Sequence, residues 1–308
     1  MTAIANGRTA ARSSGRAATG RRIARRRPQV GAHVFLLVLV VYFLMPLWWV
    51  IVASTKDAHG LFAGSAGTLW FDKNFHLIQN LQLLFTYDQG IYLRWLGNSA
   101  MYALAGGLGA TILAVLAGYG FAKYDFQGRS FSFALLLGSV MVPLTALVIP
   151  TFMMLSQVHL TDTVWAVILP SLLNPFGVYL MRVYIADAVP DELLDAARVD
   201  GAGEARTFFR VAFPLMRPAV VTVLLLSIVG TWNNYFLPLA VLSSSKLFPI
   251  TVGLGLWEGL ASSNSGTGTV SLWTVIVTGS LVAVIPLIIA FLALQRYWQG
   301  GLAIGSLK

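Results

Sequence analysis

The side chains with the most potential for chemistry lie between positions 182 and 217, where acidic, basic and aromatic residues are mixed. Asp191 and Asp195 stand four residues apart, so that in a helix their like charges repel; Arg206 and Arg210 repeat this spacing. Within the segment only Asp195 and Arg198, three residues apart, are spaced to form an ion pair. Three phenylalanines follow, Phe208, Phe209 and Phe213. Exposed aromatic rings and unpaired charges are typical of a surface that docks another protein, and the alternative is an amphipathic hairpin lying on the membrane.

The same segment predicts a helix–glycine–helix elbow. Asp191, directly after Pro190, favours a helix start because a carboxylate accepts the free N–H groups there and suits the positive end of the helix dipole. Leu193, Leu194 and Ala197 give this helix an apolar stripe. Gly201 is suited to end it with a positive φ. A second short helix is expected over 204–213, ending at Pro214.

Residue patterns for covalent, metal or redox chemistry are missing. The chain has no cysteine, and none of its five lysines follows a glycine, so it holds no Walker-type nucleotide loop. The long apolar stretches contain no Asp, Glu, Lys or Arg, and only His33 lies at the edge of one. Proton- or ion-coupled transporters and intramembrane proteases usually place ionisable side chains there. We therefore expect no catalytic residue and no metal site, and uphill transport would need a partner that supplies energy.

The composition requires a lipid environment for the elements that carry these residues. Hydrophobic residues make up 57% of the 308 residues and charged residues 11%, too few charges to cover a water-facing surface. Six apolar stretches are each long enough to cross a bilayer as a helix: 31–54, 98–122, 130–155, 163–181, 219–242 and 270–294. The sequence predicts an all-α, polytopic membrane protein with six transmembrane helices, whose membrane domain spans 31–308.

Prolines and small residues modify these spans. Pro143 and Pro150 should kink or break the third span near its outer end, and the short fourth span contains Pro170 and Pro175. Small-residue steps in the second span favour close helix packing: Gly106 to Ala110 and Ala114 to Gly118.

The basic residues predict the orientation. With the N-terminus inside, 17 of the 21 Lys and Arg residues lie on the cytoplasmic side and 4 outside, so both termini are expected in the cytoplasm. Eight arginines fall within the first 27 positions, and we interpret residues 1–30 as a disordered basic cytoplasmic tail that touches anionic lipid. The tail has neither interleaved aromatic residues nor a folded scaffold, so nucleic-acid binding is not expected.

Polar and aromatic residues inside the spans are the candidate substrate contacts. Sugars bind to aromatic faces and to fixed amide or hydroxyl groups. Trp232, Asn233, Asn234 and Tyr235 cluster near mid-depth of the fifth span, and Asn174 lies in the fourth. Hydrogen bonding between helices is the alternative role for each amide, because a buried amide needs a partner. Asn98, Ser99 and Tyr102 lie at the outer end of the second span.

Two extracytoplasmic loops remain. Residues 55–97 form the longest one, in which leucines and phenylalanines over 74–86 suggest an interfacial helix. Residues 243–269 are rich in Gly and Ser and contain Trp257, and 262–269 could equally be a flexible connector.

The elbow resembles the EAA loop of the permease subunits of ABC importers. The run from Asp195 to Ala202 reads DAARVDGA, with Phe213 and Pro214 a dozen residues later. The sequence WNNY at 232–235, the Leu-Pro that follows it and the C-terminal QRYWQGGL resemble the carbohydrate-importer branch, specifically the maltose-type second permease subunit. The likeness covers about residues 35–308.

This resemblance implies a non-catalytic subunit in the inner membrane of a bacterium, with the fold of an ABC importer permease. The implied ATPase-coupling residues are Asp195, Ala196, Ala197, Asp200, Gly201, Ala202, Phe213 and Pro214. Asp195 takes the place of the family's usual Glu, with Glu192 and Asp200 as possible substitutes for the ion pair to the ATPase. The implied partners are a second permease subunit, two ATPase subunits that hold ATP and Mg, and an extracytoplasmic substrate-binding protein. No cofactor is expected on this chain.

The implied cargo is a carbohydrate, a di- or oligosaccharide, moved by alternating access. The coupling loop reports on the ATPase and not on the cargo, so a polyol or glycerol phosphate stays open. A self-sufficient secondary transporter or channel is the alternative of a different class, and a membrane enzyme is the third.

Overall fold

The computed structural model describes residues 30–63, 69–263 and 272–304, and the basic tail lies outside them. The regular structure of the described residues is entirely helical, which confirms the all-α prediction. The chain divides into two units, Met1–Pro46 and Leu47–Lys308. The first helix, α1, crosses this boundary, and all the contacts described below lie within the second unit.

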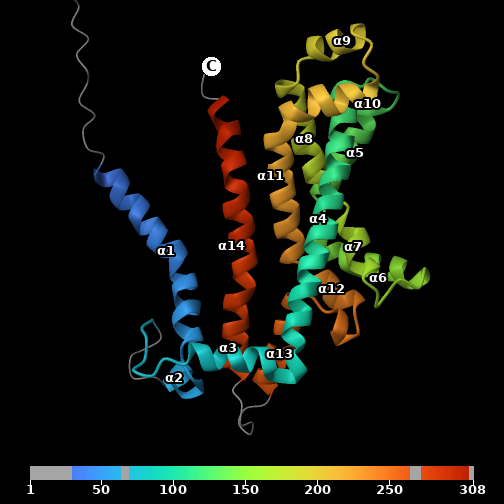
Figure 1. Ribbon diagram of the computed structural model, residues 1–308. Helices are drawn as coiled ribbons and strands as arrows, with labels where there is room; N and C mark the ends of the chain where they lie inside the picture. Colours follow the sequence, from blue (N-terminus) through green and yellow to red (C-terminus); the bar gives the residue numbers. More distant parts are fainter. Residues whose placement is uncertain (1–29, 64–68, 264–271, 305–308) are drawn as a thin grey trace, which may run out of the picture. The chain divides into compact units, whose positions relative to one another are not determined.

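The helices follow one another as shown in Figure 1. The first half of the chain contains α1 (Val30–Ser54), α2 (Ala58–Ala63), α3 (Leu77–Thr86), α4 (Ile91–Lys123), α5 (Arg129–Val140) and α6 (Val148–Gln157). The second half contains α7 (Trp165–Ser171), α8 (Pro175–Ala188), α9 (Asp191–Val199), α10 (Glu204–Thr207), α11 (Phe213–Trp232), α12 (Phe236–Val241), α13 (Ile250–Ser263) and α14 (Leu272–Ile304).

Helices long and apolar enough to cross a membrane number five among the described residues, or six if a bent pair counts as one span. The bent pair is the predicted third span: α5 and the segment Leu144–Gln157 meet at 98°. The break covers residues 141–143 and ends at Pro143, as expected because a proline cannot continue a helix. The 12 residues of α5 are about 18 Å long, shorter than a bilayer core of about 30 Å.

The predicted fifth span was placed too late in the sequence. The helix begins at Glu204 and continues without interruption to Trp232, so it neither stops at Pro214 nor reaches position 242. A π-helical turn, Phe208–Ala212, precedes Pro214. The wider turn accommodates the proline ring and its missing N–H, which is why the proline does not end the helix.

The central helix is α4, which packs along α8 and α11. Two glycines allow this approach. A Cβ on Gly107 would lie 3.0 Å from the backbone nitrogen of Ile228 in α11, and one on Gly118 would lie 2.5 Å from the Cβ of Met181 in α8. The predicted close packing through small residues is therefore confirmed.

The ends of α4 meet different partners. At one end α3 lies crosswise to it, together with α13, and at the other end lies α9 (Figure 1). The helix α3 confirms the one predicted within 74–86. By contrast, residues 250–263 were expected to be loop and form α13, because Trp257 is buried against the rings of Tyr92 and Trp95 and fixes that segment. The remainder of the proposed connector, 264–269, lies outside the described residues.

Candidate coupling elbow and translocation pathway

The elbow, defined here as residues 190–213, is turned by Gly201. The φ of Gly201 is +82°, as predicted. The N–H of Gly201 donates to the carbonyl of Arg198 at 3.0 Å, and the N–H of Ala202 donates to that of Ala197 at 2.9 Å. These two bonds form a Schellman motif, which satisfies the free carbonyls at the end of α9.

Apolar side chains hold the elbow on the ends of α4, α8 and α11. Leu194 is buried in a cluster that includes Met181, Ile185 and Met216. Phe208 is also buried there, with its ring 4.9 Å from that of Tyr119. The expectation of three exposed phenylalanines was therefore wrong for Phe208 and for Phe213, which packs on the same cluster. The apolar side chains of the elbow left exposed are chiefly Val199, Phe209 and Leu193.

The charges of the elbow are better paired than their spacing indicated. The guanidinium of Arg198 donates to Asp195 at 2.9 Å, as predicted, and also to both carboxylate oxygens of Glu204, at 2.9 and 3.3 Å. Glu204 accepts a further hydrogen bond, of 2.5 Å, from the hydroxyl of Tyr124. The ammonium of Lys123 lies 2.7 Å from Asp191. Local spacing gave no signal for the contacts of Lys123 and Tyr124, because they join the end of α4 to residues 68 and 80 positions away.

These contacts shift the protonation equilibria of the elbow. Hydrogen bonds from Arg198 and then from Tyr124 lower the pKa of Glu204, because they stabilise its charged form. The bond to Glu204, more than burial, raises the pKa of the Tyr124 hydroxyl to about 12. The carboxylates of Glu204 and Asp195 in turn raise the pKa of Arg198. At neutral pH the elbow is therefore joined to the end of α4 by charged groups.

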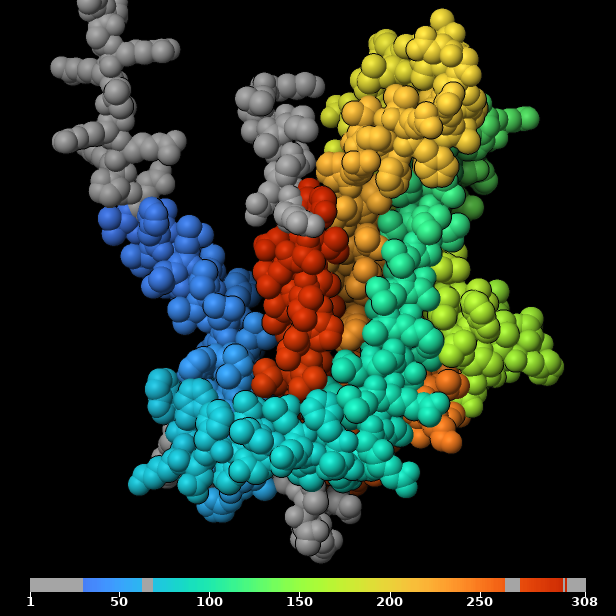
Figure 2. Space-filling view, in the orientation of Figure 1, coloured from blue at the N-terminus to red at the C-terminus, as the bar shows by residue number. Residues whose placement is uncertain are grey.

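The coupling residues implied by resemblance fall into two groups. Asp195, Ala196, Asp200 and Gly201 are exposed, whereas the others are partly buried: Ala197, Ala202, Phe213 and Pro214. In Figure 2 the atoms of α9 and the following turn, in yellow, project from one end of the helix bundle. Nothing else in the described part of the chain covers them on the face shown.

Asn174 forms a bond between helices. Its side chain accepts from the N–H of Gly177 at 2.8 Å and so caps α8, and it donates to the hydroxyl of Ser227 in α11 at 2.9 Å. These contacts match the alternative role that the sequence left open for this amide.

The WNNY cluster lies at a break between helices, not within one. Trp232 ends α11 and is buried in an apolar cluster with Trp95 and Trp257. Asn233 is exposed and Asn234 is partly buried, with its carbonyl accepting from the hydroxyl of Thr251 at 2.8 Å. Tyr235 contacts the backbone of Gly255 closely enough that a Cβ there would meet its ring at 2.9 Å. Asn233 is therefore the most exposed residue of the four.

The end of α4 opposite the elbow forms hydrogen bonds with the backbone of another segment, a role that the sequence did not indicate. Carbonyl groups of the segment 243–250 accept hydrogen bonds from four side chains of α4: Arg94, Trp95, Asn98 and Tyr102. In the opposite direction, the N–H of Ile250 donates to the hydroxyl of Ser99, also in α4. From the other side Asp162 accepts the N–H groups of Ser243 and Ser244 at 2.9 and 2.8 Å, and these bonds lower its pKa.

No group of three or more His, Asp or Glu residues that could hold a metal ion occurs within the described ranges.

Comparison with known proteins assigns this architecture to a family. The profile of the family described as "binding-protein-dependent transport system inner membrane component" matches residues 110–302. The chain belongs to this family. Its members are permease subunits of ABC transporters, so the chain is a multi-pass protein of a bacterial inner membrane that works with a partner permease, an ATPase and a substrate-binding protein.

Three relatives of this family permease, each at least 30% identical to it, carry sugar-transport names. It is 34% identical to the arabinooligosaccharides transport system permease protein AraQ of Halalkalibacterium halodurans, over 86% of this chain and 91% of the relative. The corresponding protein of Bacillus subtilis is 33% identical, over 91% and 96%. The lactose transport system permease protein LacG of Rhizobium radiobacter is 30% identical, over 92% and 98%.

A solved structure has the same fold as this permease. A chain of a bacterial ABC transporter involved in the import of the acidic polysaccharide alginate superposes with a TM-score of 0.74, covering 87% of this chain and 95% of that one at 23% identity. The fold of an ABC importer permease is thus confirmed.

Proposed function

We propose that this permease forms half of the pathway of an importer for a di- or oligosaccharide, coupled to ATP hydrolysis through the elbow. The observation that carries the coupling role is the projecting α9, which ends in the Schellman turn at Gly201 and pairs with the end of α4 through Lys123, while Tyr124 bonds to Glu204 of α10. A surface that is exposed yet rigidly joined to the central helix is suited to receive force from another protein.

Within the elbow, the free acidic groups are the proposed contacts of the ATPase. Asp195 is engaged by Arg198, whereas Glu192 and Asp200 are exposed and have no ion-pair partner among the described residues. We propose that a basic residue of the ATPase pairs with Asp200 or Glu192, or takes Asp195 from Arg198. The exposed Leu193 and Phe209 would supply the apolar part of this interface.

The cargo is proposed from the relatives and from the charge of the spans. The three relatives described above, at 30–34% identity, are named for arabinooligosaccharides and lactose, which are uncharged sugars. The apolar stretches of this chain carry no Lys or Arg that would neutralise an anionic solute. We propose Asn233 and Tyr235, at the break after α11, as substrate contacts. For Trp232 and Asn234 we propose a structural role, which is to fix the conformation of that break.

The assembly is proposed as a heterodimer of permeases with two ATPase subunits, which bind ATP and Mg, and with both termini of this chain in the cytoplasm. To test it, the chain would be tagged, extracted mildly from its native membranes, and its companions identified. Two ATPase copies and one different permease per tagged chain are the expected result. In proteoliposomes with the binding protein, arabinooligosaccharides or lactose should stimulate ATP hydrolysis, whereas glycerol 3-phosphate should not.

The alternative of a secondary transporter predicts a different result from the same preparation. The tagged chain would emerge alone or as a homodimer, and an ion gradient would suffice for uptake by vesicles that contain only this protein. Either finding would overturn the proposed coupling.

A further inference from the structure

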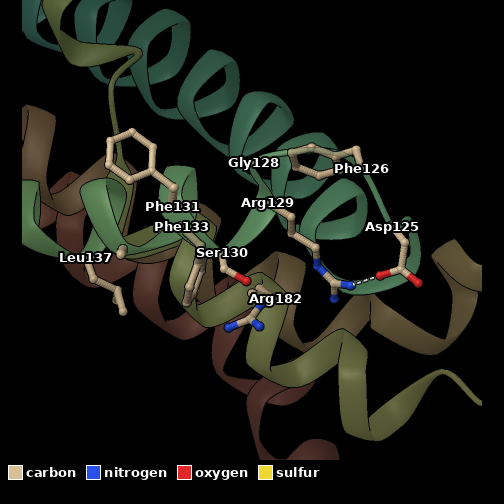
Figure 3. A pocket seen from close by; sticks show the side chains of 10 residues that line it. Asp125, Phe126, Gly128, Arg129, Ser130, Phe131, Phe133, Leu137 and Arg182 are labelled. Carbon is tan, nitrogen blue, oxygen red and sulfur yellow. Dashed lines mark hydrogen bonds and ion pairs between the residues drawn. The ribbon is translucent and has the colours of Figure 1, made fainter.

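We infer that a hollow between α5 and α8 binds the phosphate of an anionic phospholipid from the cytoplasmic leaflet. The hollow has a volume of about 800 Å³ and lies at the end of the bundle that carries the elbow. Its lining comes from the loop after α4, from α5 and, through Arg182, from α8 (Figure 3). The inference rests on the proposed orientation of the chain but not on its cargo.

The floor of the hollow is basic. The guanidinium of Arg182 lies 3.8 Å above the centre of the Phe133 ring and has no carboxylate partner within the described residues. Arg129 donates to the carbonyl of Phe121 at 2.9 Å and pairs with Asp125. The side chain of Asp125 is 96% exposed, so water screens its charge. Two guanidinium groups against one screened carboxylate leave a net positive site, suited to a phosphodiester.

The rim of the hollow is apolar and exposed. Phe131 is 75% exposed, and Phe126 and Leu137 are also exposed. The hydroxyl of Ser130 lies between this rim and Arg182. A free phosphate would use the basic floor alone. A phospholipid would place its phosphate on Arg182 and lay its acyl chains on Phe131 and Leu137, so the combination favours lipid.

The depth of the site fits a headgroup. Arg129 is the first residue of α5, and Arg182 lies six residues before the end of α8, or about 9 Å below it. Basic pockets between transmembrane helices on the cytoplasmic side bind anionic headgroups, and each basic side chain near that surface strengthens the attraction.

Native mass spectrometry of the purified complex, titrated with phosphatidylglycerol or phosphatidylcholine, tests the inference. Arg182→Gln should weaken the tightest phosphatidylglycerol binding about fivefold, since one arginine is removed. Arg217→Gln, which removes an exposed arginine outside the hollow, should leave it unchanged. Phosphatidylcholine should bind weakly to all variants, and inorganic phosphate should not displace the bound lipid.

A second variant tests the phospholipid site if Arg182→Gln fails to fold. Ser130→Asp places an acid in the first turn of α5, where it favours the helix, yet it would repel a phosphate in the hollow. Its control is Ser132→Asp, an exposed site on the same helix that does not line the hollow. Equal phosphatidylglycerol binding in Ser130→Asp and Ser132→Asp would overturn the inference.

Two other results would also overturn it. Displacement of the bound phosphatidylglycerol by inorganic phosphate would make this a site for a free anion. Loss of a protein subunit from Arg182→Gln, with lipid binding unchanged, would make the hollow a protein interface.

Discussion

Gly201 is the residue on which the direction of the elbow depends. Its φ of +82° is a conformation that costs a non-glycine residue about 1–2 kcal/mol, and no atom lies within 4 Å of the position a Cβ would take. A substitution there therefore tests backbone conformation without a steric clash.

We expect Gly201→Val to leave the protein inserted in the membrane but to uncouple ATP hydrolysis from uptake, because the altered turn misdirects α9. The measurement is sugar uptake and ATP hydrolysis in parallel. Gly203→Val is the matched control, since Gly203 has a φ of −67° and open space around it. Normal uptake in Gly201→Val would contradict the role given to the turn.

Glu204 joins three parts of the structure, because it accepts from Arg198 of α9 and from Tyr124 at the end of α4. Its folded-state pKa is lowered from the ordinary 4.5, so the stability it provides is present above about pH 4.5 and is lost as the pH falls through the lowered value. For Tyr124 the sign is opposite: its pKa is raised from 10.0 to about 12, so that its contribution is complete below pH 10 and lost as the pH rises through 12.

We expect Glu204→Gln to lower the thermal unfolding midpoint in detergent at pH 7 by a few degrees, with a difference from wild type that shrinks as the pH is lowered from 7 to 3. The titratable carboxylate is removed while the size of the side chain is kept. Glu192→Gln, an exposed acid without an ion-pair partner in the described part of the chain, should leave the midpoint unchanged at both values. A Glu204→Gln difference that persists unchanged at pH 3 would show that charge is not its cause.

At the scale of elements, the sequence predicted most of the helices but misplaced their ends. Apolar length and proline positions predicted α1, α4, α14 and the break after α5. The uninterrupted course through Pro214 and the helix α13 depend on a π-helical turn and on the packing of Trp257 against Tyr92, and neither is visible in local spacing. For the same reason the contact between Tyr124 and Glu204 was missed, since it spans 80 positions.

The packing of α4 on α11 depends on Gly107, because a glycine has no side chain that would keep the two helices apart. We expect Gly107→Ala to lower the free energy of unfolding by about 1–3 kcal/mol, because its methyl group would press on the backbone of Ile228. Gly120→Ala, in the same helix and with open space around it, should be neutral or stabilise α4 slightly. Thermal unfolding of both variants in one detergent gives the comparison, and equal midpoints would contradict the proposed close contact.

At the scale of the whole molecule, the absence of cysteine from the sequence makes the proposed orientation testable. Asp200 and Lys246 are exposed and lie near opposite ends of α4. The variants Asp200→Cys and Lys246→Cys would each carry a single cysteine at one of these positions. In intact cells a membrane-impermeant maleimide should label position 246 and not position 200, and both should react in broken membranes. The reverse pattern would place the elbow outside and exclude its contact with a cytoplasmic ATPase.

The single helix α4 touches both working ends of the molecule. Its 33 residues measure about 50 Å. Lys123 holds the elbow at one end, while Trp95 and Asn98 hold the segment 243–250 at the other. Such a helix acts as a lever: a tilt of about 10° around its midpoint would move the two ends by about 4 Å in opposite directions. If the proposed coupling holds, closure of the ATPases against the elbow would therefore also move the segment 243–250, without any rearrangement inside the helix.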